Sequence, residues 1–186
     1  MSQTDLLSAP PTLGLPGERP HRGFDTLPAV GAVSAKTYSR FQARPIVPAL
    51  GVEISSIDLR DIDPAAQDEL RAVLADRKVL VFRDQHLTPH QYAAFLRVFG
   101  NPVKEDMMVD NGHPPEVGAI HTRPDELQQI NFWHMDHSFR PLPTRVLSLY
   151  SRLLPPVGGD TLFVSLAAAY DALSAELKEK VDGLHC

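Results

Sequence analysis

Hydrophobic and polar positions follow regular periods along much of the chain after residue 40. In GVEISSIDL, residues 51 to 59, Val52 and Ile54 alternate with Glu53 and Ser55. This period of two predicts a half-buried strand. KVLVFR, residues 78 to 83, is almost wholly apolar between its terminal basic residues. That pattern predicts a short buried strand.

Two helices are predicted around the second of these strands. Asp63 and Pro64 are the residue types expected at an N-cap and in a first helical turn, and Leu70, Val73 and Leu74 follow as an apolar stripe. The stretch TPHQ, residues 88 to 91, has the form of a capping box with proline at the first helical position. Apolar residues follow with helical spacing before a closing glycine: Tyr92, Phe95, Leu96, Phe99 and Gly100.

The later chain predicts a long loop followed by further strands and helices. Residues 101 to 130 are rich in proline and glycine, which is typical of a functional loop or lid. Strands are predicted for residues 144 to 151 and within 155 to 165. Ser165 and Ser174 are then expected to cap two helices, the second of which ends before Gly183.

Composition sets broad limits on the class of protein. The 186 residues are 43% hydrophobic and 22% charged, as expected for one soluble globular domain. Residues 1 to 40 lack any period and predict a disordered or loosely attached extension, which leaves 41 to 186 as the domain. A net charge of −5 argues against a nucleic-acid partner, and no apolar run approaches the ~20 residues that cross a membrane.

The single cysteine, Cys186, excludes an internal disulfide. Because no secretory signal is evident either, the cytoplasm is the default localisation. The sequence does not fix the oligomeric state, and a homo-oligomer stays open.

The stretch WHMDHSF, residues 133 to 139, contains the strongest candidate for chemistry. On an extended strand, His134 and Asp136 would project from the same face. An imidazole and a carboxylate form part of the set of two histidines and one carboxylate that holds ferrous iron in oxygenases. A polar strand that happens to carry histidines is the alternative, and a hydrolytic zinc site is a weaker one because such sites commonly use more histidines.

Several segments together resemble a known family, the iron(II)- and 2-oxoglutarate-dependent dioxygenases of the taurine/2,4-dichlorophenoxyacetate dioxygenase family. They are residues 80 to 100, 133 to 139 and 155 to 165, and residues 51 to 59 stand where that family has its first sheet strand. The resemblance implies a mainly β fold with flanking helices, a double-stranded β-helix or jelly roll. It also implies Fe(II), 2-oxoglutarate and O2 as the reactants at the site, and a small-molecule substrate.

The resemblance assigns roles to individual residues. His134 and Asp136 would be iron ligands, and Thr161 would contact a carboxylate of 2-oxoglutarate; the alternative for Thr161 is an ordinary residue of a β-strand. Substrate contacts would come from Asn131, Phe139 and His121, although Phe139 could equally belong to the core. The position at which the taurine enzyme holds its substrate with an asparagine is Ile130, which argues against taurine itself.

The family also needs a second metal histidine and a nearby arginine for 2-oxoglutarate, both far downstream of the first pair. Only fifty residues, 137 to 186, follow Asp136, and the sole later histidine is His185. We therefore expect an incomplete jelly roll, the N-terminal part of a dioxygenase, that is inactive by itself. The predicted reaction is hydroxylation of a small anionic compound such as a sulfonate, an alkyl sulfate or an aryloxyalkanoate, with release of succinate and CO2. The alternative is a non-catalytic short form that has lost the metal chemistry.

Overall fold

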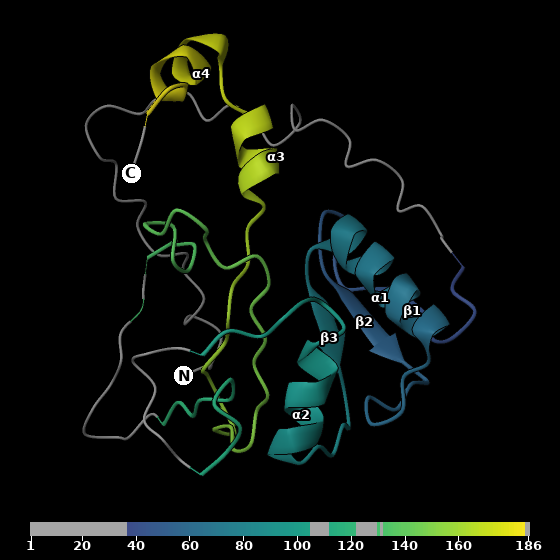
Figure 1. The fold of residues 1–186 in the computed structure, drawn as a ribbon. Coiled ribbons are helices and arrows are strands. Elements are labelled where there is room, and N and C mark those ends of the chain that lie inside the picture. The colour runs from purple at the N-terminus through teal and green to yellow at the C-terminus, as the bar shows by residue number, and fades with distance from the viewer. Residues whose placement is uncertain (1–36, 105–111, 122–129, 131, 185–186) are drawn as a thin grey trace, which may run out of the picture.

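The computed structural model describes residues 37–104, 112–121, 130 and 132–184. Within them the chain forms three short strands and four helices, shown in Figure 1. In chain order these are β1 (Gln42–Pro45), β2 (Val52–Ser55), α1 (Pro64–Arg77), β3 (Leu80–Phe82), α2 (Pro89–Leu96), α3 (Leu166–Asp171) and α4 (Ala175–Val181).

The strands form one sheet in the order β1-β2-β3. β1 runs antiparallel to β2, whereas β2 and β3 are parallel, with Val52 opposite Leu80. Parallel strands need a crossover connection, and α1 provides it, packed along the sheet in Figure 1. The strands predicted within residues 51 to 59 and 78 to 83 are both confirmed.

Helix α1 begins and ends as its sequence predicts. The side chain of Asp63 accepts a hydrogen bond from the backbone N–H of Ala66 at 2.7 Å, which is the N-cap interaction that satisfies a free donor of the first turn. At the other end Lys78 takes a left-handed conformation, and its N–H donates to the carbonyl of Leu74. Leu70 and Val73, from the predicted stripe, are 0% and 1% exposed.

Helix α2 also has its predicted capping box, but it is shorter than expected. The N–H of Gln91 donates to the Thr88 hydroxyl at 3.2 Å, and the Gln91 side chain accepts from the N–H of Thr88 at 2.8 Å. The helix ends at Leu96, because the N–H groups of the next residues bond to carbonyls only three positions earlier. Such bonds tighten the last turn of a helix. The chain changes direction after this turn at Gly100, which has a positive φ.

The hydrophobic core lies between the sheet, α1 and α2. Side chains from all three meet there, and the rings of Phe82 and Phe95 contact each other edge to face at 5.6 Å. The buried cluster consists of Phe41, Val52, Ile54, Leu59, Leu70, Val73, Leu87, Phe95 and Val98. We refer to residues 38 to 100, which carry this core, as the N-terminal unit.

The N-terminal unit includes the residues just before the predicted domain start. The backbone N–H and hydroxyl of Ser39 donate to the carboxylate of Glu69 on α1, at 3.0 and 2.6 Å. Arg40 forms an ion pair with Asp63 at 3.3 Å. No helix in the described part of the chain is long and apolar enough to span a membrane.

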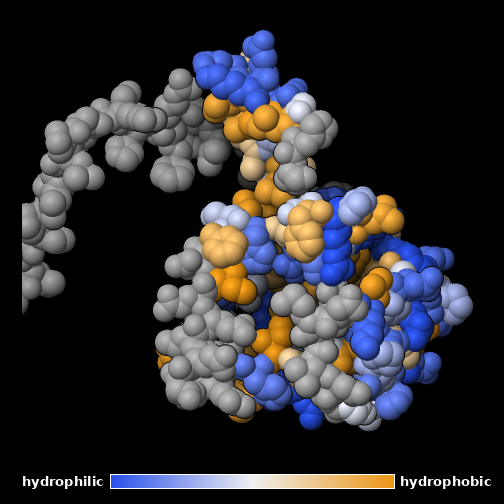
Figure 2. Space-filling view, turned by 60° about the vertical axis from the view of Figure 1, so that its left-hand side comes forward, coloured by the Kyte–Doolittle hydropathy of each residue, from blue (hydrophilic) through white to orange (hydrophobic). Residues whose placement is uncertain are grey.

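The strands predicted after residue 130 are not formed, which corrects the prediction for residues 144 to 151 and 155 to 165. Among the described residues these segments pair with no strand and have no ladder hydrogen bonds. A strand is stable only beside a partner strand. Many of their apolar side chains are exposed, including Leu153 at 93%. Figure 2 shows apolar (orange) side chains on the surface of the projecting end that carries α3 and α4.

The expected double-stranded β-helix is therefore not shown by the described residues. β1 and β2 have four residues each, whereas α1 alone has 14. The predicted caps of α3 and α4 are confirmed, because the hydroxyls of Ser165 and Ser174 accept from backbone N–H groups three residues later. Gly183 follows the end of α4 with a positive φ of 83°, also as predicted.

Candidate metal centre

His134 and Asp136 lie side by side. Nε2 of the imidazole is 3.2 Å from Oδ1 of the carboxylate. Both side chains are partly accessible, at 42% and 37%. The predicted proximity is confirmed, but the predicted strand is not, because the chain enters a turn at Asp136.

The imidazole of His134 is oriented by its second nitrogen. Nδ1 lies 3.2 Å from the backbone carbonyl of Phe132. A carbonyl can only accept a hydrogen bond, so Nδ1 carries a proton, and Nε2 is the nitrogen that faces Asp136. Such a hydrogen bond on the far nitrogen is typical of histidines that bind metals.

The spacing of the two donor atoms fits a shared cation. Nitrogen and oxygen ligands that bind a transition metal at roughly 2.1 Å and at right angles lie about 3.0 Å apart. The separation between His134 and Asp136 is close to this value. The two residues present therefore suit an iron ion as neighbouring ligands.

His137, next to Asp136, is directed elsewhere. Its Nδ1 lies 2.6 Å from the hydroxyl of Thr144, and its ring contacts Phe139 at 6.0 Å. The residue has a φ of 56°, in the left-handed region that a residue with a side chain seldom occupies. Among the residues that the structure describes, no cluster of three histidine, cysteine or acidic side chains forms a metal site.

Within the described residues, no hydrogen bond, ion pair or ring contact joins the other predicted site residues to His134 or Asp136. Thr161 and His121 are exposed, and Phe139 is 74% exposed. Gly158 and Gly159, just before Thr161, both have positive φ, a conformation that glycine adopts readily. Asn131 and His185 lie outside the described residues.

The long segment predicted as a loop is described only in part. Residues 112 to 121 form turns and irregular structure, and Glu116 pairs with Arg97, just after α2, at 2.6 Å. This ion pair joins the loop to the N-terminal unit. A role for the loop in substrate selection stays a prediction.

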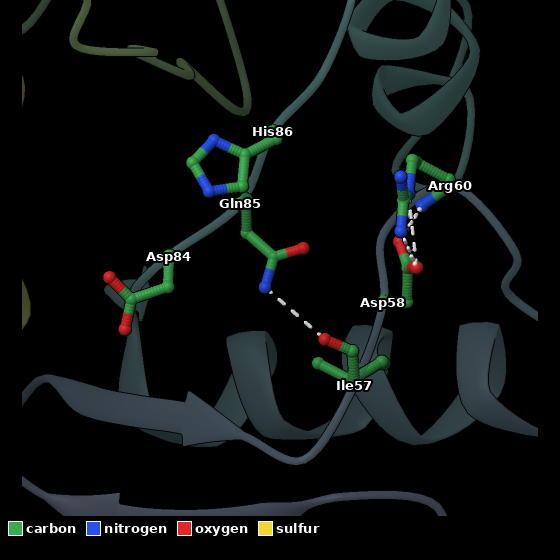
Figure 3. Close-up of a pocket in the computed structure, with 6 residues that line it drawn as sticks. All are labelled: Ile57, Asp58, Arg60, Asp84, Gln85 and His86. Atoms are coloured by element: carbon green, nitrogen blue, oxygen red, sulfur yellow. Dashed lines mark hydrogen bonds and ion pairs between the residues drawn. The ribbon is translucent and has the colours of Figure 1, made fainter.

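A small cavity of about 160 Å³ lies beyond the C-terminal ends of β2 and β3 (Figure 3). None of the predicted site residues lines it. Gln85 crosses it and donates to the carbonyl of Ile57 at 3.2 Å. Arg60 donates hydrogen bonds to Asp58, which lowers the pKa of that carboxyl to about 2. Asp58 and Arg60 bind each other and Gln85 binds backbone groups, so the Gln85 side chain connects the segments that follow β2 and β3.

Sequence reasoning missed the contacts that attach the later chain to the N-terminal unit. The hydroxyl of Tyr150 donates to the carbonyl of Gln85 at 2.9 Å, and that of Tyr92 donates to Ser148 at 2.8 Å. The two tyrosine rings are 5.5 Å apart. The sequence offers one signal, the hydroxyl groups of Ser148 and Tyr150 at alternate positions.

Comparison with family models shows a match over most of the chain. Residues 42–185 match the model described as taurine catabolism dioxygenase TauD, TfdA family. This range takes in the N-terminal unit apart from its first residues, the His134–Asp136 pair and the segment with Thr161.

Curated relatives include several alpha-ketoglutarate-dependent enzymes; alpha-ketoglutarate is another name for 2-oxoglutarate. The (S)-phenoxypropionate/alpha-ketoglutarate-dioxygenase of Sphingobium herbicidovorans is 33% identical, over 77% of this chain and 52% of the relative. The alpha-ketoglutarate-dependent 2,4-dichlorophenoxyacetate dioxygenase of Cupriavidus pinatubonensis is 32% identical, over 76% and 56%. The alpha-ketoglutarate-dependent sulfonate dioxygenase of Saccharomyces cerevisiae is 33% identical, over 78% and 38%.

Solved structures with a similar fold include proteins of the same kind. A taurine dioxygenase from Burkholderia xenovorans superposes with a TM-score of 0.62 at 33% identity, covering 78% of this chain and 52% of the other. The structure of AAD-2 in complex with Mn(II) and N-oxalylglycine gives a TM-score of 0.54 at 29% identity, covering 76% and 49%. The chain thus spans about half the length of the first proteins that it matches.

Proposed function

The chain belongs to the taurine catabolism dioxygenase TauD, TfdA family, and on that premise we propose that it carries part of the iron centre of a 2-oxoglutarate-dependent dioxygenase. The proposed reaction hydroxylates a C–H bond of a small organic anion. One atom of O2 enters the substrate and the other enters 2-oxoglutarate, which leaves as succinate and CO2. The fold proposed for the complete enzyme is the jelly roll.

One observation supports the iron assignment more than any other, namely the arrangement of His134 and Asp136. The 3.2 Å separation of Nε2 and Oδ1, with Nδ1 turned to the carbonyl of Phe132, presents two donors of the kinds that ferrous oxygenases use. When bound, iron with 2-oxoglutarate and O2 would supply the oxidising chemistry. His134 and Asp136 would hold the ion, and the Asp136 carboxylate would offset part of its charge.

The remaining predicted residues are assigned to the reactants. We propose that the hydroxyl of Thr161 donates a hydrogen bond to a carboxylate of 2-oxoglutarate. Asn131, Phe139 and His121 are proposed to line the substrate pocket. These assignments rest on the match of the surrounding segments to the family, which extends over residues 42–185.

The proposed substrate class is a small anion with an acidic group beside an alkyl or aryl part. The relatives are named for phenoxypropionate, 2,4-dichlorophenoxyacetate and sulfonates, all of which have this character. Ile130 is 63% exposed, and its aliphatic sec-butyl side chain offers no hydrogen bond to a sulfonate. A substrate held partly by apolar contact, such as an aryloxyalkanoate, therefore suits this chain better than taurine.

The experiment is a succinate assay on the full natural product of the reading frame that contains these residues. Fe(II), 2-oxoglutarate and O2 are supplied, and a phenoxyalkanoate, an alkyl sulfate ester and an alkyl sulfonate are offered in separate reactions. We expect succinate formation that depends on one of these substrates and is lost in the His134→Ala variant. The control variant is His90→Ala, which changes a surface histidine on α2 and should retain succinate formation. Absence of succinate with every substrate class would contradict the proposal and favour a non-catalytic protein.

A further inference from the structure

Two side chains of the segment from 144 to 150, those of Ser148 and Tyr150, contact the N-terminal unit. Thr144, Ser148 and Tyr150 are half-buried, whereas the residues between them are exposed, namely Arg145, Val146, Leu147 and Leu149. A period of two is the mark of an extended chain lying on a surface. Ser148 and Tyr150 thus lie on one face as they would in a strand, without pairing to any described strand.

The far end of this segment is fixed by the Tyr150 hydroxyl. It donates to the carbonyl of Gln85 at 2.9 Å and accepts from the N–H of Leu87 at 3.0 Å. Two backbone groups of the connection between β3 and α2 are thereby satisfied by one side chain. The amide side chain of Gln85 in turn bonds to the carbonyl of Ile57 and the N–H of Leu59, so this connection is itself held against the sheet.

A second attachment lies two residues earlier. The hydroxyl of Tyr92, on α2, donates to that of Ser148 at 2.8 Å. The ring of Tyr92 also contacts that of Tyr150 at 5.5 Å. Because Tyr92 belongs to a capped helix packed on the core, the segment is anchored to a rigid element.

The near end of the segment reaches the candidate metal centre. The hydroxyl of Thr144 lies 2.6 Å from Nδ1 of His137, the residue after Asp136. The N–H of Arg140 donates to the carbonyl of His137 at 3.0 Å, which closes the turn. The hydrogen bond to Thr144 thus links a turn that contains a metal-ligand candidate to the anchored segment.

From these contacts at the two ends of one backbone segment we propose that Thr144 is a positioning residue for the metal centre, acting through His137, with Tyr150 as its anchor on the N-terminal unit. The proposal rests on the proposed function, because it concerns the same His134–Asp136 pair. A turn held in one conformation loses less freedom when its carboxylate binds a cation. Loosening the turn should therefore weaken metal binding without removing a ligand.

The test measures Mn(II) affinity of the 186-residue chain by the loss of the free-ion electron paramagnetic resonance signal. Thr144→Val removes the hydroxyl and keeps the shape, so we expect Mn(II) binding about 2- to 10-fold weaker, the range set by one hydrogen bond. Thr144→Ser keeps the hydroxyl and should restore the wild-type affinity. Tyr150→Phe keeps the ring contact and should weaken binding by a similar factor, although it lies far along the chain from either ligand.

Three outcomes distinguish this proposal from the proposed function. If His134→Ala leaves Mn(II) binding unchanged, the metal assignment fails. If His134→Ala abolishes binding while Thr144→Val and Tyr150→Phe both bind as wild type, the positioning role is overturned and the iron centre stands. Weaker Mn(II) binding in Thr144→Val, with wild-type binding in Thr144→Ser, supports the positioning role. The amide protection of Val52 in the core should stay unchanged in both variants, because only a loss of stability of the fold would lower it.

Discussion

Nε2 of His134 and Oδ1 of Asp136 lie 3.2 Å apart, and Nδ1 of the same imidazole faces the carbonyl of Phe132. The carbonyl fixes which nitrogen is free to bind, and the turn at Asp136 brings the carboxylate to it. The pair therefore has both the donor types and the spacing of two neighbouring ligands on one transition metal. This relationship connects the sequence, the family and the proposed chemistry.

We predict that the purified 186-residue chain forms no succinate from 2-oxoglutarate. Two ligands cannot by themselves hold iron, 2-oxoglutarate and O2 in the arrangement that the reaction needs. The segments after residue 140 also expose apolar side chains, so a broad thermal transition is expected from this part of the chain. Measurable turnover would contradict the prediction and would make His121 or His185 a candidate third ligand.

The Thr161→Val variant should raise the concentration of 2-oxoglutarate required by the complete natural enzyme. Removing one hydroxyl that bonds to a carboxylate costs ~1.5–3 kcal/mol, which corresponds to roughly a 10- to 100-fold loss of affinity. Titration of 2-oxoglutarate in the succinate assay measures the effect. Thr161→Ser is the matched control and should stay near wild type. An unchanged requirement in Thr161→Val would leave this residue with a structural role only.

Truncating Leu70 to alanine should destabilise the core of the N-terminal unit. The side chain is 0% exposed, and replacing a buried leucine by alanine costs about 2–5 kcal/mol because a cavity remains. Hydrogen exchange at the N–H of Val52, which bonds to the carbonyl of Val79 at 2.9 Å, reports the change. Leu153→Ala, at a position that is 93% exposed, should change this protection by no more than ~0.5 kcal/mol. Equal effects in the two variants would refute the assigned core.

The Asp58–Arg60 pair predicts a pH effect. Hydrogen bonds from Arg60 lower the pKa of the Asp58 carboxyl from its ordinary value of 3.8 to about 2. Because the folded-state pKa is the lower one, the pair's contribution to stability is present above pH 3.8 and is lost as the pH falls through about 2. In Arg60→Gln the carboxyl should titrate nearer 3.8 by carbon NMR, whereas Arg83→Gln, whose guanidinium pairs with Glu53, should not move it. Titration near 2 in Arg60→Gln would contradict the assigned cause.

Local signals made the N-terminal unit predictable from the sequence. The caps at Asp63 and Thr88 involve residues only three positions apart, so residue types alone identify them. The strand periods at Val52 and Leu80 were sufficient because the helix between them brings the two strands side by side as a parallel pair. The early end of α2 was missed, because an apolar residue at Phe99 continues the helical spacing after the backbone has tightened.

Long-range contacts could not be predicted in the same way. Strands at 144 to 151 and 155 to 165 were expected from their apolar residues, but strand formation depends on a partner, which periodicity does not reveal. Tyr150 bonds to Gln85 across 65 positions, and no local pattern encodes such a pairing. His134 and Asp136 were predicted to project together from an extended strand. They do lie close together, but a turn that begins at Asp136 brings them there.

The most direct test of the iron assignment is the effect of Mn(II) on the NMR spectrum of the chain. Mn(II) is a redox-stable substitute for Fe(II), and a related structure contains it. Paramagnetic broadening identifies nearby nuclei even when binding is weak. We predict that low Mn(II) concentrations selectively broaden the imidazole of His134 and the carboxyl of Asp136, leave His90 on α2 sharp, and lose this selectivity in Asp136→Asn. Broadening that is equal at His134 and His90, or that persists unchanged in Asp136→Asn, would contradict the assignment of the metal centre.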